Sequence, residues 1–134
     1  MNKVFRLFAV VAMVAMVACS SKGKTVYVQD YITEDMTDDV YPAIRLALEE
    51  ALTSDNSTLV FPGGTLNIKE TYCFEKYQFI SNNTQGKKRI AIDVVGANGL
   101  TIEGNGTTLL FTGCISPFNV ENSKNIVIKD LNVD

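Results

Sequence analysis

Apolar and polar positions repeat along the last third of the chain with a constant spacing. Four apolar residues between positions 92 and 102 each have an apolar counterpart 26 positions later; the two sets are Ile92, Val94, Leu100, Ile102 and Phe118, Val120, Ile126, Ile128. The corner "GANG" (96–99) aligns in the same way with "NSKN" (122–125). Repeats of about 20–50 residues are typical of stacked architectures in which one repeat forms one layer.

The repeat predicts a right-handed parallel β-helix. Each unit contains short strands and no helix, so successive coils would place their inward residues over one another, with strands about 4.8 Å apart. Leucine-rich repeats are the competing stacked fold, but they need a leucine ladder and an asparagine pattern that this sequence lacks. We therefore predict an all-β fold in which residues 25–134 form the N-terminal cap and first coils of such a β-helix.

One segment departs from the strand pattern and predicts an α-helix over 40–52. Its apolar residues lie three or four positions apart and form one stripe, made of Val40, Ile44, Ala47, Leu48 and Ala51. Pro42 is tolerated because it lies in the first turn, and Thr37, Asp38 or Asp39 supplies the N-cap. We expect this helix to cap the β-helix, with Ile44 and Leu48 covering the first coil.

Shorter strands are expected before the repeat. "TVYVQDYI" (25–32) has the alternation of a strand, and so do 59–61 and 65–68, which are separated by the turn Pro62-Gly63-Gly64. The polar region 69–89 predicts one or two strands joined by a loop. Within it, "SNNTQG" (81–86) is interpreted as a surface loop, with contact to a sugar as the alternative.

The last ten residues, "NIVIKDLNVD" (125–134), predict a strand that bends at Lys129-Asp130, where the alternation breaks. This segment is the beginning of a coil without the rest of that coil. We therefore expect the chain to be the front part of a longer protein.

The first eighteen residues predict an export signal. Lys3 and Arg6 precede the apolar run "LFAVVAMVAMVA", which is short for a transmembrane span. "MVAC" resembles the lipobox of bacterial lipoproteins, so residues 1–18 are interpreted as a lipoprotein signal peptide, with Cys19 as the lipidated residue. Residues 19–24 would then tether the protein to a membrane of the bacterial cell envelope. An ordinary cleaved signal with a chance cysteine is the alternative.

The net charge and the residue composition exclude some classes of binding partner. The net charge is −3, and it becomes −5 without the two basic residues of the leader, so nucleic acid is not an expected partner. The acidic balance also disfavours a polyanionic substrate such as pectate. With no histidine and no close cysteine pair, no metal site is predicted. Cys73 and Cys114 either form a disulfide or are two separate buried thiols, because a sequence does not give their distance.

Two turn motifs have a structural interpretation. The glycines of "EGNG" (103–106) are expected to allow positive φ at a corner, because no helix follows to receive a phosphate. Asn122 and Asn125 at the later corner are interpreted as members of an asparagine ladder.

Several segments resemble known enzymes. "TDDVYPAIRLALEEA" followed by "LVFPGGTL" is similar to the opening of pectate-lyase-like β-helix enzymes. "YQFISNN", "KKRIAIDVVGANGLTIEGNGTTLLFTG" and "SPFNVENSKNIVIKDLNVD" resemble the N-terminal portion of the α-1,3-galactosidases of glycoside hydrolase family 110. The resemblance spans residues 25–134. It implies a lipid-anchored, exo-acting, inverting enzyme that needs no cofactor and removes terminal α-1,3-linked galactose from blood-group-B-like glycans.

The catalytic residues are not assigned. Inversion requires an acid and a base carboxyl group roughly 6.5–9.5 Å apart, and the carboxylates of the repeat region are Asp93, Glu103, Glu121, Asp130 and Asp134. Each is interpreted as surface, and we expect the catalytic pair to lie beyond residue 134, so that this chain alone is inactive. The alternatives are a β-helix adhesin or glycan-binding lipoprotein without catalysis, and part of a polysaccharide lyase.

Overall fold

The computed structural model describes residues 23–79 and 86–134. The expected leader 1–18, Cys19 and nearly all of the loop 81–86 lie outside the described residues. The elements in chain order are β1 (Thr25–Tyr27), the 3-10 helix η1 (Val28–Tyr31), α1 (Tyr41–Ala51), β2 (Ser57–Val60), β3 (Thr65–Lys69), the 3-10 helix η2 (Glu70–Tyr72), β4 (Phe74–Tyr77), β5 (Lys87–Val95), β6 (Asn98–Thr112), β7 (Ser116–Glu121) and β8 (Lys124–Val133).

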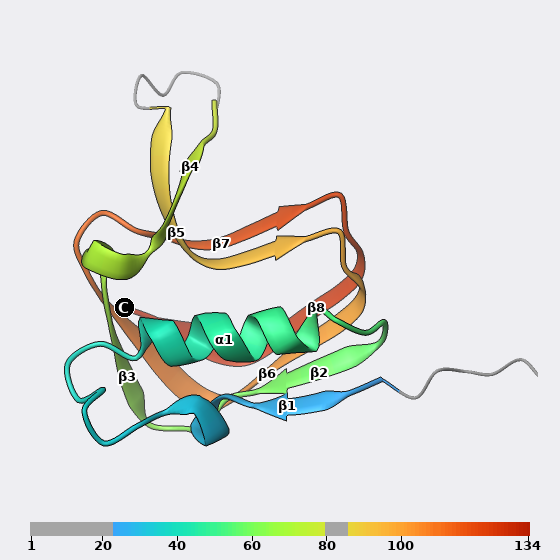
Figure 1. Cartoon of the computed structure of the whole chain (residues 1–134), viewed down its shortest axis with the longest axis horizontal. Coiled ribbons are helices and arrows are strands. Elements are labelled where there is room, and N and C mark those ends of the chain that lie inside the picture. The colour runs from blue at the N-terminus through green and yellow to red at the C-terminus, as the bar shows by residue number, and fades with distance from the viewer. Residues whose placement is uncertain (1–22, 80–85) are drawn as a thin grey trace, which may run out of the picture.

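Most of the chain forms two sheets, as Figure 1 shows. In the first sheet the long strand β6 pairs in parallel with β2 through its first half and with β3 through its second half, β1 extends the sheet beyond β2, and β8 runs along the other edge of β6. The second sheet has the order β4-β5-β7, with β5 and β7 parallel and β4 antiparallel to β5. The expectation of an all-β fold rich in parallel pairing is confirmed.

The 26-residue repeat corresponds to strand pairing between successive layers. Ile92 pairs with Phe118 and Val94 with Val120 where β5 meets β7. Leu100 pairs with Ile126 and Ile102 with Ile128 where β6 meets β8. Because parallel partners place their side chains on the same face, a constant offset keeps apolar residues over apolar residues. All four predicted pairs are therefore confirmed.

The corner between the two sheets is also repeated. Gly96 and Asn122 have φ angles of 69° and 49°. The backbone N–H of Ala97 donates to Ser123 Oγ at 3.0 Å, and the N–H of Lys124 donates to the Ala97 carbonyl at 2.9 Å. The two corners "GANG" and "NSKN", which align in the sequence, thus also share a left-handed backbone conformation at their equivalent residues Gly96 and Asn122. Asn122 and Asn125 supply left-handed corner residues, whereas the ladder of asparagine side chains stays a prediction.

The bend within β6 and β8 forms a second column of left-handed residues. Gly63, Gly106 and Asp130 have φ angles of 88°, 73° and 52° and occupy equivalent positions before β3, in β6 and in β8. The register shifts between Glu103 and Thr107, so β8 makes the same bend with fewer residues than β6. The predicted bend at Lys129-Asp130 is confirmed.

Only part of the "EGNG" interpretation is confirmed. Asn105 and Gly106 have positive φ (49° and 73°), whereas Gly104 does not. A Cβ at Gly104 would collide with the carbonyl group of Asp130 in the neighbouring strand. Gly104 is therefore required by the close approach of two backbones rather than by its own backbone conformation.

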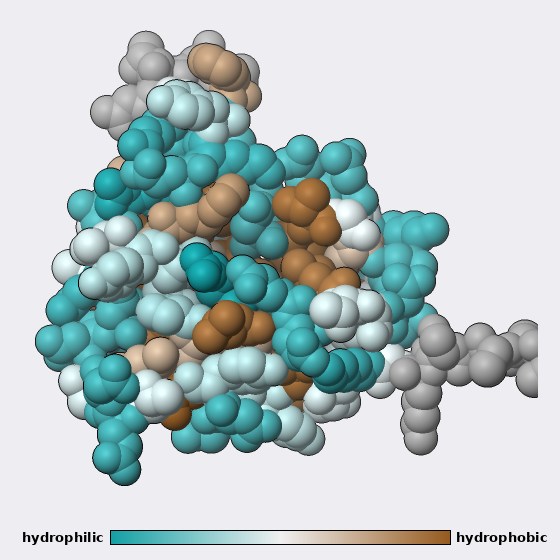
Figure 2. Space-filling model, in the orientation of Figure 1, coloured by the Kyte–Doolittle hydropathy of each residue, from teal (hydrophilic) through white to brown (hydrophobic). Residues whose placement is uncertain are grey.

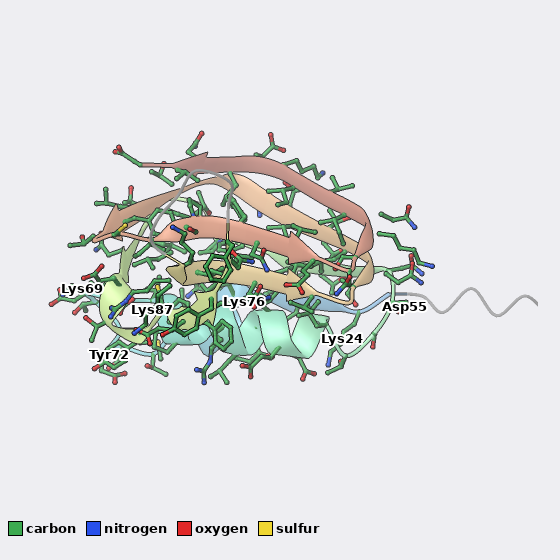
Figure 3. The ribbon with its side chains drawn as sticks, turned by 90° about the horizontal axis from the view of Figure 1, so that it is seen from above. Lys24, Asp55, Lys69, Tyr72, Lys76 and Lys87 are labelled. Atoms are coloured by element: carbon green, nitrogen blue, oxygen red, sulfur yellow. The ribbon has the colours of Figure 1, made fainter. Side chains whose placement is uncertain are left out.

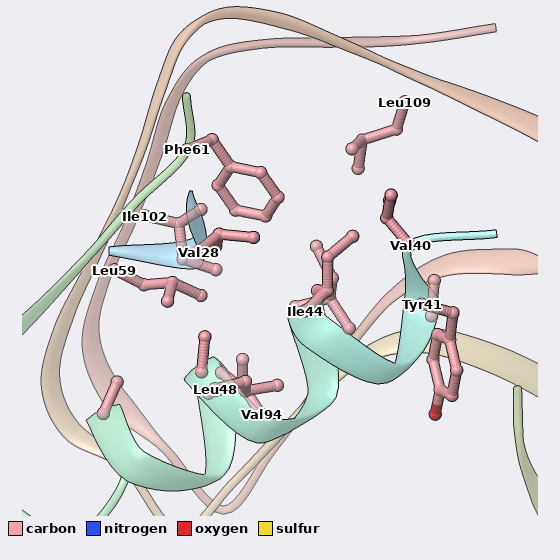
Figure 4. Close-up of a cluster of buried hydrophobic side chains, with 14 of the residues drawn as sticks. Val28, Val40, Tyr41, Ile44, Leu48, Leu59, Phe61, Val94, Ile102 and Leu109 are labelled. Atoms are coloured by element: carbon pink, nitrogen blue, oxygen red, sulfur yellow. The ribbon is translucent and has the colours of Figure 1, made fainter. Parts of the chain in front are cut away.

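The predicted helix is present as α1. Its buried residues include Ile44 and Leu48, which are 0% and 4% exposed, and it packs against β1, β2, β3 and β5. Figure 4 shows both side chains pointing from the helix toward a cluster that includes Leu59 of β2, Ile102 of β6 and Phe61, which directly follows β2. The prediction that these two residues lie in the core is confirmed.

The helix begins one residue later than predicted. Val40 occupies the N-cap position and its side chain makes no capping bond. Instead Asp39 Oδ1 accepts the N–H of Tyr41 at 3.0 Å and that of Lys69 at 3.2 Å. Asp39 therefore satisfies one free donor of the first turn and also joins the helix to the end of β3.

The first strand is shorter than predicted. Within 25–32 only Thr25–Tyr27 forms a strand, and Val28–Tyr31 turns into a 3-10 helix. The partner strand β2 ends at Val60, and Pro62 soon after it has no N–H to extend a ladder. Val26 and Val28 are both buried nonetheless, so the predicted apolar face is correct although the strand is not continuous.

Candidate functional site

A network of polar side chains lies where β4, β5 and β7 come together. The ammonium group of Lys76 forms ion pairs with Glu121 and, at 3.8 Å, with Asp93. Asn119 donates a hydrogen bond from Nδ2 to Asp93, and Gln78 Nε2 donates to Asn119 Oδ1 at 2.7 Å. Five side chains from three separate stretches of the sequence are thus joined in one set of hydrogen bonds and ion pairs, which we name the Lys76 network.

Strand pairing explains why these residues meet. Asp93 and Asn119 are register partners of the β5–β7 ladder, 26 positions apart, so their side chains lie on one face of the sheet. Lys76 and Gln78 come from the hairpin that β4 forms with the beginning of β5. In the view of Figure 3, Lys76 lies between the end of the molecule that carries Lys69 and Tyr72 and the end that carries Lys24 and Asp55.

The ion pair between Lys76 and Glu121 favours the charged form of both groups. The hydrogen bond with Lys76 lowers the pKa of Glu121, and the same bond raises the pKa of Lys76. A carboxylic acid that donates a proton during glycoside hydrolysis needs the opposite shift, a raised pKa. Glu121 is therefore suited to accepting hydrogen bonds rather than to general-acid catalysis.

The Asp93–Glu121 pair also lacks the form of an inverting pair. Both carboxylates contact the single ammonium group of Lys76, so a cation occupies the space between them that inversion needs for a water molecule. These two are the predicted carboxylates that the structure brings together around a shared partner.

The other candidate carboxylates lie along β6 and β8. Glu103 forms an ion pair with Lys129, and that bond lowers the pKa of Glu103. Asp130 is exposed at the bend of β8. Asp134 is exposed, while its backbone N–H donates to the Leu109 carbonyl at 3.0 Å. Asp130 and Asp134 therefore lie at the surface, whereas Glu103 is half-buried, and the expectation that the catalytic pair lies elsewhere stays a prediction.

Two hollows flank the Lys76 network. One, of about 180 Å³, lies beside α1 and is lined by Tyr41, Arg45, Leu48, Glu49, Leu52, Phe74, Ala91 and Asp93. The hydroxyl of Tyr41 accepts the backbone N–H of Phe74 at 2.9 Å, which ties the helix to the hairpin at this hollow. Figure 2 shows that the face carrying α1 is mainly hydrophilic, with separate hydrophobic patches.

The other hollow, of about 410 Å³, is a groove lined by Lys76, Tyr77, Gln78, Phe79, Asn119, Val120 and Glu121. Two of its aromatic side chains are largely exposed, Tyr77 at 76% and Phe79 at 88%. Aromatic faces and fixed hydrogen-bonding groups therefore line one concave surface. Such a surface suits a ligand that has both apolar and hydroxyl-bearing faces.

Sequence reasoning missed most of this site. The pairing of Asp93 with Asn119 was available from the 26-residue offset, because it lies inside the repeat. The positions of Lys76 and Gln78 could not be predicted, because the polar region 69–89 contains no repeat that would set its strand register. Both residues lie in the region that was predicted to form strands joined by a loop, and the antiparallel pairing of β4 with β5 brings them to the site.

The two cysteines among the described residues are free thiols. Cys73 is buried and Cys114 is exposed. Burial raises the pKa of Cys73 to about 11, which keeps its thiol protonated at neutral pH. Of the two alternatives left by the sequence, separate thiols is the arrangement present here, but the expectation that both thiols are buried is wrong for Cys114.

Residues 23–79 and 86–134 contain no group of three or more acidic, cysteine or histidine side chains placed to bind a metal ion. Among those residues no helix has the length and apolar character needed to cross a bilayer.

Comparison with known proteins supplies the family relationship. No family model matches the chain. It is 32% identical over 97 residues to alpha-1,3-galactosidase A of Shewanella woodyi, a match covering 72% of this chain. It is 30% identical over 114 residues to alpha-1,3-galactosidase B of Bacteroides thetaiotaomicron, covering 84% of this chain, and 30% identical over 101 residues to the B enzyme of Parabacteroides distasonis, covering 72%.

The chain is homologous to the alpha-1,3-galactosidases. The resemblance expected from "KKRIAIDVVGANGLTIEGNGTTLLFTG" and its neighbouring segments is thereby confirmed. The chain spans 16% to 18% of the length of these relatives, as an N-terminal portion of such an enzyme would. The homology thus supports a relationship to glycoside hydrolases over a limited part of the full enzyme.

Proposed function

We propose that this chain is the N-terminal portion of an exo-acting, inverting glycoside hydrolase that removes terminal α-1,3-linked galactose from glycans. The observation that carries the proposal is its 30% to 32% identity, over 72% to 84% of the chain, to proteins named alpha-1,3-galactosidase. In this role the described residues supply the beginning of the scaffold, and the reacting carboxyl groups belong to other parts of the enzyme.

The scaffold would be a right-handed parallel β-helix whose first coils are the layers seen here. Three features support it: the 26-residue register of β5 with β7 and of β6 with β8, the parallel stacking of β2 and β3 on β6, and the repeated left-handed corners. α1 would be its N-terminal cap, because it packs on the strands of the earliest layers. Stacked coils hold side chains at fixed separations, as a pair of catalytic carboxyl groups requires.

The chain alone would not hydrolyse α-galactosides. Among the described candidates, Glu103 and Glu121 each pair with a lysine that lowers their pKa. Hydrolysis with inversion needs one carboxyl group that holds its proton and a second that activates water. The assay is release of galactose by the purified chain from an aryl α-galactoside and from a blood-group-B trisaccharide. Release by a monodisperse monomer would contradict this proposal and return Asp93, Asp130 and Asp134 as candidates.

A chimera tests the family function directly. The segment of the Bacteroides thetaiotaomicron relative that aligns with this chain is replaced by residues 23–134, and hydrolysis of an α-1,3-linked digalactoside is measured. Equivalent scaffold segments predict retained hydrolysis with inversion of the anomeric centre, whereas deletion of the segment abolishes it. A folded chimera without hydrolysis would argue for the alternative of a non-catalytic glycan-binding protein.

We also propose that Cys19 is lipidated and holds the protein at the bacterial cell envelope. The support is the sequence "MVAC" after a basic and apolar leader. The full chain and its Cys19→Ser variant are expressed in a bacterial host and the membrane fraction is separated. Wild type should sediment with membranes and the variant should not. Equal membrane association of both proteins would overturn the assignment.

A further inference from the structure

We propose that the groove lined by β4 and β7 is a binding site for one neutral hexose residue of a galactose-containing oligosaccharide. The choice of galactose rests on the proposed function, whereas the site itself is argued from the structure. Its volume of about 410 Å³ is of the size found in small-molecule sites.

Aromatic side chains provide the apolar contact. Tyr77 and Phe79 line the groove and are 76% and 88% exposed, which leaves their ring faces accessible. The face of an aromatic ring carries partial negative charge and attracts the slightly positive C–H groups of an apolar ligand face. A pyranose ring has such a face of axial C–H groups, so it can stack on either ring.

The hydrogen-bonding groups are already held in place. Gln78 donates to Asn119 at 2.7 Å, Asn119 donates to Asp93, and Lys76 joins Asp93 to Glu121. The backbone N–H of Gln78 donates to the Gly86 carbonyl at 2.7 Å, which fixes this end of the hairpin. Groups fixed before binding lose little conformational entropy when a ligand arrives, so they favour binding to hydroxyl groups.

Charge balance selects a neutral ligand. The single cation of the groove, Lys76, is neutralised by its ion pairs with Glu121 and Asp93. No cation among the groove-lining residues remains free for the carboxylate of a uronic acid, and the surplus carboxylate repels one. A neutral hexose needs no free cation for binding and is not repelled by the carboxylate.

The test measures binding to the purified full chain in detergent by saturation-transfer NMR and calorimetry. The probes are methyl α-galactoside, an α-1,3-linked digalactoside, maltose and galacturonate. We expect the two galactosides to bind and galacturonate not to bind. Maltose binding equal to that of the digalactoside would retain the hexose site and overturn its preference for galactose.

Substitutions of the aromatic residues test whether the sugar binds in this groove. Tyr77→Ala and Phe79→Ala should each weaken binding about tenfold, the usual effect of removing an aromatic anchor. Tyr72→Ala is the matched control, because Tyr72 is 65% exposed but lies outside the groove, at the end of the molecule seen in Figure 3. Circular dichroism checks that each variant is folded. Absence of binding by the folded chain, or equal binding by all three variants, would overturn the site.

The same variants separate this inference from the proposed function. A chimera that hydrolyses the digalactoside, together with a folded chain that binds none of the probes, would reject the groove and keep the enzyme. Probe binding lost in Tyr77→Ala and Phe79→Ala, together with a folded but inactive chimera, would keep the groove and reject the enzyme.

Discussion

Gly99 and Asn125 occupy equivalent corners in successive layers and share a left-handed backbone, with φ angles of 79° and 56°. Asn56 continues the column with φ of 54°, and its side-chain oxygen lies 2.3 Å from the position that a Cβ on Gly99 would take. Glycine and asparagine tolerate this conformation better than other residues do. One column of corners therefore explains the residue types at three positions of the sequence.

Substitutions at Asn125 should separate backbone strain from side-chain contacts. Asn125→Val places a β-branched residue at positive φ and should lower the free energy of unfolding by about 1–2 kcal/mol. Asn125→Gly should leave it nearly unchanged. Urea unfolding followed by circular dichroism measures both. Equal destabilisation by the two variants would mean that the asparagine side chain, rather than the φ angle, matters at this corner.

The buried stripe of α1 should dominate the stability of the helix. Ile44→Ala and Leu48→Ala each remove a buried side chain and should lower the free energy of unfolding by about 2–5 kcal/mol. Leu46 lies on the same helix but is 45% exposed, so Leu46→Ala is the matched control and should change stability little. Similar losses in all three variants would contradict the packing in Figure 4.

Acid should destabilise the protein through Glu103 and Glu121. Ion pairs with Lys129 and Lys76 lower the pKa of these carboxylates in the folded state. Each therefore stabilises the fold above its unfolded pKa of about 4.3, and this contribution is lost as the pH falls through the lower, folded pKa. Glu121→Gln should make the loss of unfolding free energy between about pH 5 and pH 3 less steep.

The control for acid unfolding is Glu34→Gln. Glu34 is exposed, and it forms no ion pair with the described residues. Its replacement should leave the pH dependence of unfolding as in the parent chain. If Glu121→Gln and Glu34→Gln have the same profile, the Lys76–Glu121 pair does not contribute to stability.

The two described cysteines should differ in reactivity. At pH 8 iodoacetamide should modify exposed Cys114 readily, whereas Cys73, with its pKa raised to about 11 by burial, should react on the order of 100-fold more slowly than an ordinary exposed thiol. Mass spectrometry of proteolytic peptides assigns each site. Recovery of a Cys73–Cys114 disulfide peptide from protein made in an oxidising compartment would show that the pairing alternative applies there.

The sequence alone determined which residues face the interior of the repeated layers. The apolar residues alternate and recur at a constant offset, and parallel strands convert that offset into direct contact, as Leu100 and Ile126 show. The stripe of α1 was equally readable, because Ile44 and Leu48 lie one helical turn apart. Local sequence was less decisive at boundaries, where the end of β2 and the side chain of Asp39 set the extent of β1 and the beginning of α1.

Only the tertiary structure decided the Lys76 network and the groove beside it. Lys76 and Gln78 lie in a polar region without a repeat, so nothing local specifies that β4 pairs with β5 at this register. The meeting of Lys76, Asp93 and Glu121 depends on the ladders from β5 to both of its neighbours. A repeated apolar pattern can be predicted from the sequence because the core of every layer has to pack in the same way. A polar site occurs once, and its side chains come together only when the strands pair, so no sequence pattern predicts it.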